Sequence, residues 1–245
     1  RGPVVVANWE SAVSRNEVGV IDAGTGKWRA LSKLNTERTA SIDWQPVEEF
    51  EFRSSRGAQI HSLLVRPPAF DPSKKYPLFV VIHGGPHSMW RDQFFIRWNY
   101  HLLAAPGYVV LLTNYSGSTG FGNAFAQAIQ GDPLKGPAME INEAADEAIR
   151  RYSFIDASRQ AAGGASYGGH LTNWIAVSTT RYKALVSHAG LFDLKTQWTT
   201  SDAVYDRERN IGGPYWEGAA LWREQSPIYF AGQLQTPMLV TIGEK

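Results

Sequence analysis

The segment Gly164-Ala165-Ser166-Tyr167-Gly168-Gly169 has the residue types of a nucleophilic serine. In a Gly-x-Ser-x-Gly pattern the glycines lack a Cβ, so neighbouring backbone can approach closely without a clash. A strand-like run precedes the pattern and a helix-like run follows it. In that context the motif forms a sharp turn that holds the serine in strained geometry with its Oγ exposed. The pattern predicts that Ser166 is a nucleophile; the alternative is a passive serine in a Gly-rich turn.

A second motif, His83-Gly84-Gly85-Pro86, directly follows the apolar run Tyr76–Ile82. A serine that attacks a carbonyl needs N–H donors for the oxygen that becomes negative, and glycine lets a loop pass close to that oxygen. We expect the oxyanion hole to consist of the N–H groups of Gly85 and Tyr167; a simple Gly-Gly-Pro turn is the alternative. His83 precedes the serine in the chain, so we expect it to brace this loop rather than act as a base.

The sequence offers no convincing base or acid for Ser166. His170 lies four residues later on the same predicted buried helix, so we expect it to point into the core. His188 ends a strand next to the turn and is a slightly better candidate, whereas Asp193 is expected to cap a helix or line the pocket. Glu244 is a weak candidate for the acid. Without a base, a serine hydroxyl keeps a pKa far above neutrality and is a poor nucleophile.

Other features support an active site without deciding its chemistry. The loop 114–122 is rich in glycine and hydroxyls but lacks the Lys-Ser/Thr ending of a phosphate-binding loop, so we expect it at the rim of the site. Six aromatic residues fall in predicted loops, where most should pack and one or two should line a substrate pocket: Trp90, Trp98, Trp198, Tyr205, Tyr215 and Trp216.

The elements that would position these residues fall into two regions, 1–46 and 47–245. The first region reads as all-β, with strands Pro3–Trp9, Asn16–Asp22 and Lys27–Leu31 and a turn at 23–26. In the second region strands alternate with helices, which predicts an α/β fold with a mostly parallel, doubly wound sheet. Its strands are expected at Glu49–Arg53, His61–Arg66, Tyr76–Ile82, Tyr108–Thr113, Gln160–Gly163, Ala184–His188 and Pro237–Ile242, the last two buried, and its helices at Glu140–Tyr152 and His170–Thr179.

Composition excludes several classes of function. The chain has 245 residues, of which 43% are hydrophobic, and 24 Lys+Arg against 23 Asp+Glu give a net charge of +1. Such a chain is neither disordered nor collagen-like, and near-zero charge argues against nucleic acid as a partner. No long apolar window predicts a membrane span. The absence of cysteine excludes disulfides, thiolate metal sites and a cysteine nucleophile. We expect no metal or organic cofactor.

Taken together, these motifs resemble the catalytic domain of the prolyl oligopeptidase family of serine peptidases. The resemblance covers 47–245. It rests on three motifs in their order along the chain, which are His83-Gly84-Gly85-Pro86, the loop 114–122 and Gly164-Ala165-Ser166-Tyr167-Gly168-Gly169. Further matches point to the acylaminoacyl peptidase and dipeptidyl peptidase 5 branch: Leu171-Thr172-Asn173-Trp174-Ile175, Gly212-Gly213-Pro214-Tyr215-Trp216 and Ser226-Pro227-Ile228. The resemblance implies an α/β-hydrolase domain, preceded at 1–46 by the last blade of a β-propeller.

The resemblance also implies a triad in the order Ser, Asp, His, with the acid in a turn after the strand Pro237–Ile242. Because the sequence stops at Gly243-Glu244-Lys245, we expect the Asp and His beyond Lys245 and little activity from the chain alone. The expected partners are short peptides and, within the same protein, a propeller and a C-terminal segment; a homo-oligomer stays open. Family likeness favours a periplasmic location.

The expected function is therefore a serine peptidase that hydrolyses short peptides, by dipeptidyl or acylaminoacyl release, through an acyl-enzyme on Ser166. Three alternatives stay open: an esterase or lipase of the same fold, a non-catalytic propeller–hydrolase binding protein, and a complete chain that uses His188 with Asp193.

Overall fold

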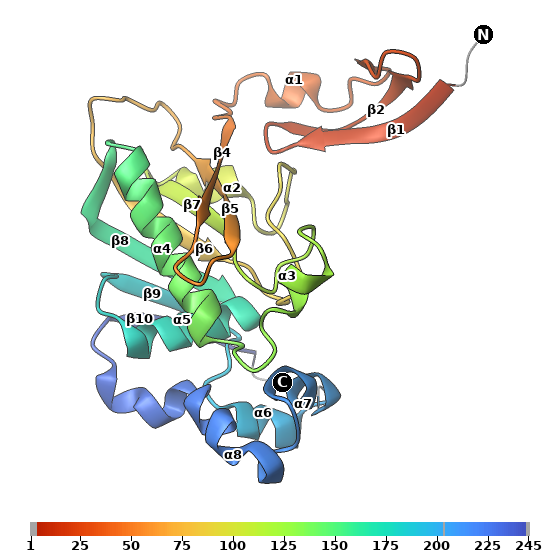
Figure 1. Ribbon diagram of the computed structural model, residues 1–245. Coiled ribbons are helices and arrows are strands. Elements are labelled where there is room, and N and C mark those ends of the chain that lie inside the picture. The colour runs from red at the N-terminus through yellow and green to blue at the C-terminus, as the bar shows by residue number, and fades with distance from the viewer. Residues whose placement is uncertain (1–3, 203, 244–245) are drawn as a thin grey trace.

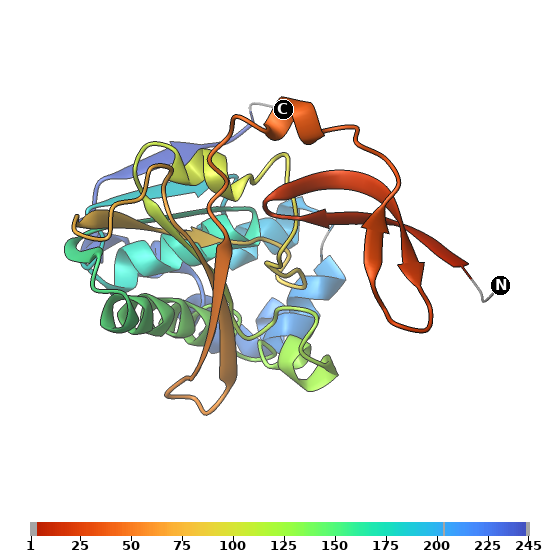
Figure 2. The same cartoon turned by 90° about the horizontal axis from the view of Figure 1, so that it is seen from above.

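The computed structural model describes residues 4–202 and 204–243, which contain two separate β-sheets (Figure 1). The smaller is antiparallel and three-stranded, formed by β1 (Val4–Ser11), β2 (Ser14–Asp22) and β3 (Trp28–Ala30). It lies to one side of the larger sheet, to which α1 (Thr36–Thr39) leads (Figure 2). The three strands expected in the first region are thus confirmed, while their assignment to a propeller blade stays a prediction.

The larger sheet has seven strands in the order β10-β9-β8-β6-β7-β5-β4. The strands from β10 to β7 run parallel, and β5 is antiparallel to both of its neighbours. The bounds are β4 (Val47–Arg53), β5 (Gln59–Val65), β6 (Tyr76–Ile82), β7 (Val109–Asn114), β8 (Ile155–Ala165), β9 (Ala184–His188) and β10 (Met238–Thr241). The mostly parallel α/β fold expected from the sequence is therefore confirmed.

Helices cover both faces of this sheet because its central strands are apolar on both sides. On one face, Leu78, Val80 and Leu111 pack with α4 (Lys135–Arg151) and α5 (Tyr167–Ser178). On the other, Val81 and Leu112 pack with Trp90 and with α2 (Tyr100–Ala104). The remaining helices are α3 (Asn123–Gln127), α6 (Leu194–Thr200), α7 (Val204–Ile211), α8 (Tyr215–Glu224) and the 3₁₀ helix η1 (Pro227–Gln233). No helix of the described part of the chain is long and apolar enough to cross a membrane.

The strand order places the two chemical motifs side by side. After β6 the chain crosses to β7 on one side of it, and then returns to β8 on the other side. Neighbouring parallel strands whose connections leave in opposite directions open a crevice at their carboxyl ends, where α/β proteins bind ligands. His83-Gly84-Gly85-Pro86 follows β6 and Ser166 follows β8, so both motifs open into this crevice.

Several expectations about burial, loops and a helix boundary are wrong. The run predicted as a buried strand at 237–242 is an exposed edge strand: Leu239 is 60% exposed, because β10 pairs with β9 alone among the described strands. β9 itself alternates, with Leu185 and Ser187 buried and Ala184, Val186 and His188 exposed. Trp198, Tyr205, Tyr215 and Trp216 do not lie in loops but on α6, α7 and α8. α4 begins at Lys135, five residues before the predicted start.

Candidate active site

Ser166 occupies a strained turn between a strand and a helix. β8 ends at Ala165, α5 begins at Tyr167, and Ser166 between them has φ 57° and ψ −122°. A positive φ is uncommon for a residue with a side chain and persists only where the surrounding structure enforces it. Here the backbone N–H of Ser166 donates to the carbonyl of His188 over 2.9 Å, and its carbonyl accepts from His170 N over 2.9 Å. The predicted strand-to-helix turn is confirmed.

The glycines around Ser166 are needed because the end of β6 passes directly beside the turn. A Cβ on Gly164 would lie 2.5 Å from the carbonyl oxygen of Ile82, and one on Gly168 would lie 2.2 Å from the same oxygen. Both distances are far below any tolerated contact with backbone. A Cβ on Gly169 would meet Gly190 Cα at 2.8 Å. The turn therefore fits against β6 and β9 only with glycine at these positions.

The loop that carries Gly84 and Gly85 packs against Ser166. A Cβ on Gly84 would lie 2.8 Å from Ala165 O and 3.3 Å from Ser166 Cβ, so the loop touches the turn. Gly85 has φ 123°, a conformation that favours glycine. The N–H groups of Gly85 and Tyr167 donate to no residue in the ranges 4–202 and 204–243. Tyr167 opens α5, where the first N–H groups have no partner within the helix.

A cavity of about 810 Å³, which we call the serine pocket, brings these groups together. Ser166, Gly85 and His188 line it, as do the aromatic side chains of Trp90 and Trp98. The expectation that one or two aromatic residues line a pocket therefore fits Trp90 and Trp98. Trp198 and Tyr215 instead pack with Trp222 in a small cluster between α6 and α8.

His83 braces the Gly84–Gly85 loop from within the protein. Its Nε2 lies 2.9 Å from Ser118 Oγ, and its ring stacks on Tyr115 with 4.3 Å between the ring centroids. The Tyr115 hydroxyl in turn donates to the His83 carbonyl over 2.6 Å. Burial lowers the pKa of His83 to about 4, against the opposing effect of its hydrogen bond to Gly84 O. The expectation that His83 braces this loop rather than acts as a base therefore agrees with its position.

Glu140 is a supporting residue that the sequence reasoning missed. Its carboxylate is fully buried and accepts from Ser116 N at 2.7 Å and from Ser116 Oγ at 2.8 Å. Burial raises the pKa of Glu140, although the two bonds from Ser116 and the charge of Arg56 oppose the shift. Glu140 thus fixes the loop 114–122, which holds His83 through Ser118. The available signal was a glutamate next to Ile141 on the apolar face of α4.

The structure does not bring a base or an acid to Ser166 among the residues it describes. Ser166 Oγ has no hydrogen bond within 4–202 and 204–243, and His188 Nδ1 instead lies 2.8 Å from Thr241 Oγ1. Asp193 caps α6 and accepts from Lys195 N and Thr196 N. Of the two roles expected for it, helix cap or pocket lining, the structure shows the helix cap. The pairing of His188 with Asp193 therefore lacks support. Glu244 lies outside the described residues.

His170 is buried in α5, as expected, and is unsuited to act as a base. It is 0% exposed, and neither ring nitrogen has a partner among the described residues. Burial, and then the nearby charge of Arg207, lowers the pKa of His170 to about 3. In the unfolded chain the imidazole titrates near its ordinary pKa of about 6.5. Unfolding therefore takes up a proton below that pH, and acid destabilises the protein through this residue.

We expect His170→Leu to flatten the acid side of the stability profile. Above pH 6.5 His170 is neutral in both the folded and the unfolded chain and costs no stability through protonation, and the cost grows as pH falls from 6.5 toward 3. Between pH 6.5 and 4 the variant should lose about 3 kcal/mol less unfolding free energy than the parent. At pH 7 its stability should be equal or higher, because two unpaired buried nitrogens are removed. Urea unfolding at several pH values measures this, and an unchanged acid slope in the variant would contradict it.

Comparison with known proteins agrees with the motifs. The chain is 34% identical over 248 residues to dipeptidyl-peptidase 5 of Aspergillus fumigatus, which covers 100% of this chain and 33% of that protein. It is 34% identical over 211 residues to dipeptidyl-peptidase 5 of Schizosaccharomyces pombe, which covers 85% of this chain and 31% of that protein. The chain thus spans about a third of the length of the curated relatives it matches.

Solved structures show the same fold. The acylaminoacyl peptidase of Pyrococcus horikoshii superposes with a TM-score of 0.88 at 24% identity, over 99% of this chain and 38% of that one. Dipeptidyl peptidase 4 of Porphyromonas gingivalis superposes with a TM-score of 0.79 at 26% identity, over 98% of this chain and 34% of that one. A model of the prolyl oligopeptidase family matches residues 93–245, which is more than half of the chain. The resemblance inferred from the motifs is thereby confirmed: this chain belongs to the prolyl oligopeptidase family.

Proposed function

We propose that the protein containing this chain is a serine peptidase that cleaves short peptides through an acyl-enzyme on Ser166. One observation carries the proposal. Ser166 is held at φ 57° in a pocket of about 810 Å³, next to a loop whose Gly85 N–H has no partner among the described residues. A strained serine that faces a cavity with unpaired N–H donors is equipped for acyl transfer.

The chemistry follows from these positions. Ser166 Oγ forms a bond to the carbonyl carbon of the scissile peptide bond and gives its proton to a base. The carbonyl oxygen becomes negative and accepts from the N–H groups of Gly85 and Tyr167. The C–N bond then breaks, the amine leaves with the proton, and water hydrolyses the ester on Ser166. No step in this sequence needs a metal or an organic cofactor.

The base and the acid belong, in this proposal, to a part of the protein outside this chain. Ser166 Oγ has no imidazole partner among the described residues, and an unassisted serine hydroxyl is a poor nucleophile. In the order Ser, Asp, His, both partners follow the strand that matches β10. The apolar side chains of β10 are exposed on both faces of the sheet, Leu239 and Val240 each by 60%, which suits further chain packing there.

The substrate class is inferred from the relatives. Two relatives at 34% identity are named dipeptidyl-peptidase 5, and a protein of the same fold is an acylaminoacyl peptidase. Both names describe release of a short unit from the N-terminus of a peptide. We therefore expect short peptides as substrates, with a dipeptide or an acylated amino acid as the released unit.

A fluorophosphonate probe should label Ser166 in the protein that contains this chain, because the probe forms a covalent bond with an activated serine. Peptide mass spectrometry locates the label, and heat-denatured protein serves as the control for chemical background. Turnover of dipeptidyl and N-acyl-aminoacyl p-nitroanilides is measured beside that of matched p-nitrophenyl esters. Labelling at another residue, or no labelling, would refute the role of Ser166. Turnover of esters alone would favour an esterase.

A further inference from the structure

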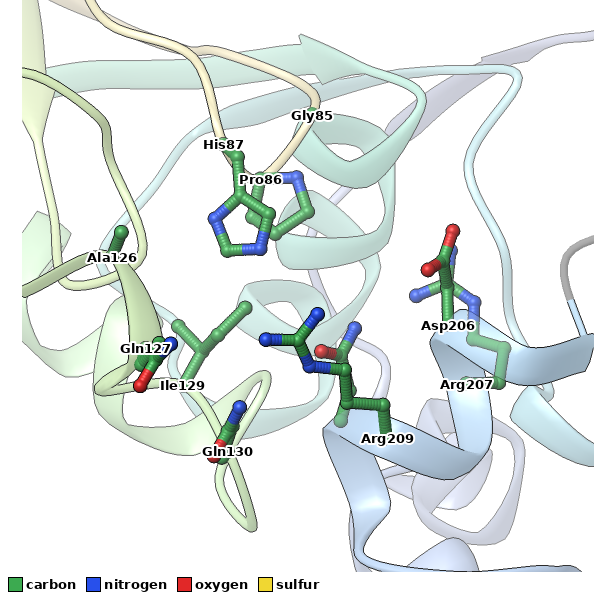
Figure 3. Close-up of a pocket in the computed structure, with 11 residues that line it drawn as sticks. Gly85, Pro86, His87, Ala126, Gln127, Ile129, Gln130, Asp206, Arg207 and Arg209 are labelled. Carbon is green, nitrogen blue, oxygen red and sulfur yellow. The ribbon is translucent and has the colours of Figure 1, made fainter. Parts of the chain in front are cut away.

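A second, smaller cavity shares a wall with the serine pocket. It has a volume of about 140 Å³, and we call it the arginine pocket (Figure 3). One wall is Gly85, Pro86 and His87; the second is the segment 126–130; the third is α7. Gly85 lines both cavities, so the proposed oxyanion donor separates them. The volume exceeds what one water molecule needs and is of the order of a single side chain.

Two arginines of α7 give this pocket its charge. Arg207 and Arg209 line it together with Asp206, which is its one acidic residue, so positive charge is in excess. Figure 3 shows Arg209 reaching from α7 toward His87 and Ile129. Neither arginine forms an ion pair with a carboxylate of the described part of the chain, and the buried Nε of Arg207 has no hydrogen-bond partner there. A buried donor without an acceptor is costly, and a ligand oxygen would remove that cost.

The arginine pocket lies close to the reacting atoms. Arg207 is near enough to Tyr167 for the two side chains to influence each other electrostatically. Burial lowers the pKa of Arg207, while Tyr167 and Asp206 oppose the shift, and a guanidinium stays charged at neutral pH. Tyr167 follows Ser166 directly and supplies the second proposed oxyanion donor. Gly85, the other proposed donor, lines the pocket itself, so the pocket lies beside the place where the attacked carbonyl would be held.

We propose that the arginine pocket receives the side-chain carboxylate of the residue whose carbonyl Ser166 attacks, so that the peptidase prefers Asp or Glu at that position. This inference rests on the proposed function. With its carbonyl oxygen at Gly85 and Tyr167, the substrate residue stands between the two cavities. The remaining chain lies in the larger serine pocket, and the smaller cavity is left for the side chain. Its two guanidinium groups, which have no carboxylate partner in the described part of the chain, suit a carboxylate, which accepts several N–H bonds.

The test compares two substrates that differ in charge but hardly in shape, Ala-Glu-p-nitroanilide and Ala-Gln-p-nitroanilide, with the N-acetyl-Glu and N-acetyl-Gln analogues beside them. The parent protein should show a kcat/KM about 10- to 100-fold higher for Glu than for Gln. In Arg207→Gln and in Arg209→Gln this ratio should fall toward one. Arg223→Gln on α8, outside both cavities, removes the same charge and should keep the parent ratio.

The outcomes separate this inference from the proposed function. Cleavage of Gln substrates as fast as Glu substrates by the parent, or a ratio that both arginine variants leave unchanged, would overturn the acidic preference alone. A different result is that the parent prefers a free C-terminal carboxylate over its amide and that both variants abolish this preference. This result would assign the pocket to the C-terminal carboxylate and would likewise overturn the proposed preference for Asp or Glu. If half-buried Arg207 cannot be replaced without unfolding, exposed Arg209 decides. Failure to cleave any peptide or to bind fluorophosphonate would refute the proposed function itself.

Discussion

Replacing Ser166 by alanine is expected to lower kcat/KM for peptide substrates by about 10⁴- to 10⁶-fold in the protein that contains this chain. The hydroxyl is the atom that forms the acyl-enzyme, and no other serine, threonine or cysteine takes its position on the turn between β8 and α5. Residual activity should come from binding and from the N–H groups of Gly85 and Tyr167, which do not depend on the side chain at 166. Initial rates with p-nitroanilide peptides measure the loss.

Stability should separate a chemical effect of this substitution from a structural one. Ser166 Oγ makes no hydrogen bond within 4–202 and 204–243, and alanine at φ 57° carries much the same backbone strain as serine. The melting temperature of Ser166→Ala should therefore stay within a few degrees of the parent. Ser178→Ala, at the far end of α5, is the matched control and should keep full activity. Turnover by Ser166→Ala within tenfold of the parent would contradict the nucleophile assignment.

The sequence was most informative where residues close in the chain determine the structure. β6 runs from Tyr76 to Ile82, as expected from a continuous apolar run, and the bounds of β9, Ala184–His188, are also those predicted. The turn at Ser166 also follows from local spacing, because the need for glycine at 164 and 168 arises wherever a strand turns sharply into a helix. The structure shows which backbone atom lies against these two glycines, namely the carbonyl oxygen of Ile82 at the end of β6.

The sequence was least informative where a residue's role depends on a distant partner. The sequence places Glu140 next to Ile141 at the start of a predicted helix but does not show that it binds Ser116, 24 positions away, in the core. Arg207 lies 120 positions from His87, and nothing in the spacing shows that both line one cavity. The exposure of β10 likewise depends on which strands pair with it, since an apolar run reads the same at an edge as at the centre of a sheet.

The order of strands explains how the two motifs, which the sequence predicted to share one oxyanion hole, come together. Each motif follows its own strand, and a single strand carries no sign of its neighbour. β6 lies between β8 and β7, and this arrangement puts Gly84 against Ala165 and Ser166. Had β7 lain between β6 and β8, the loop after β6 would not touch the turn after β8. The candidate oxyanion hole is therefore a product of topology as much as of motif.

Gly168→Ala is expected to destabilise the protein by about 3 kcal/mol or more. The added Cβ would lie 2.2 Å from Ile82 O and 2.8 Å from His83 O, and both atoms belong to backbone at the end of β6. A flexible side chain could move away from such a contact, but these carbonyls are held by the sheet and by the hydrogen bond from Tyr115. Relief therefore requires α5 and β6 to separate, which disturbs the packing of the core.

Thermal unfolding with a matched glycine variant tests this expectation. Gly232→Ala adds the same methyl group in η1, where no atom lies within 4 Å of the new Cβ and φ is not positive, so its stability should stay the same or rise by up to about 1 kcal/mol. For a chain of this size a loss of 3 kcal/mol lowers the melting temperature by roughly 6 to 12 °C. Because the same contact holds Ser166 against the Gly84–Gly85 loop, the folded fraction of Gly168→Ala should also react more slowly with fluorophosphonate. Equal melting temperatures for the two variants would show that the turn is not confined by β6, and the strain at Ser166 would then need another cause.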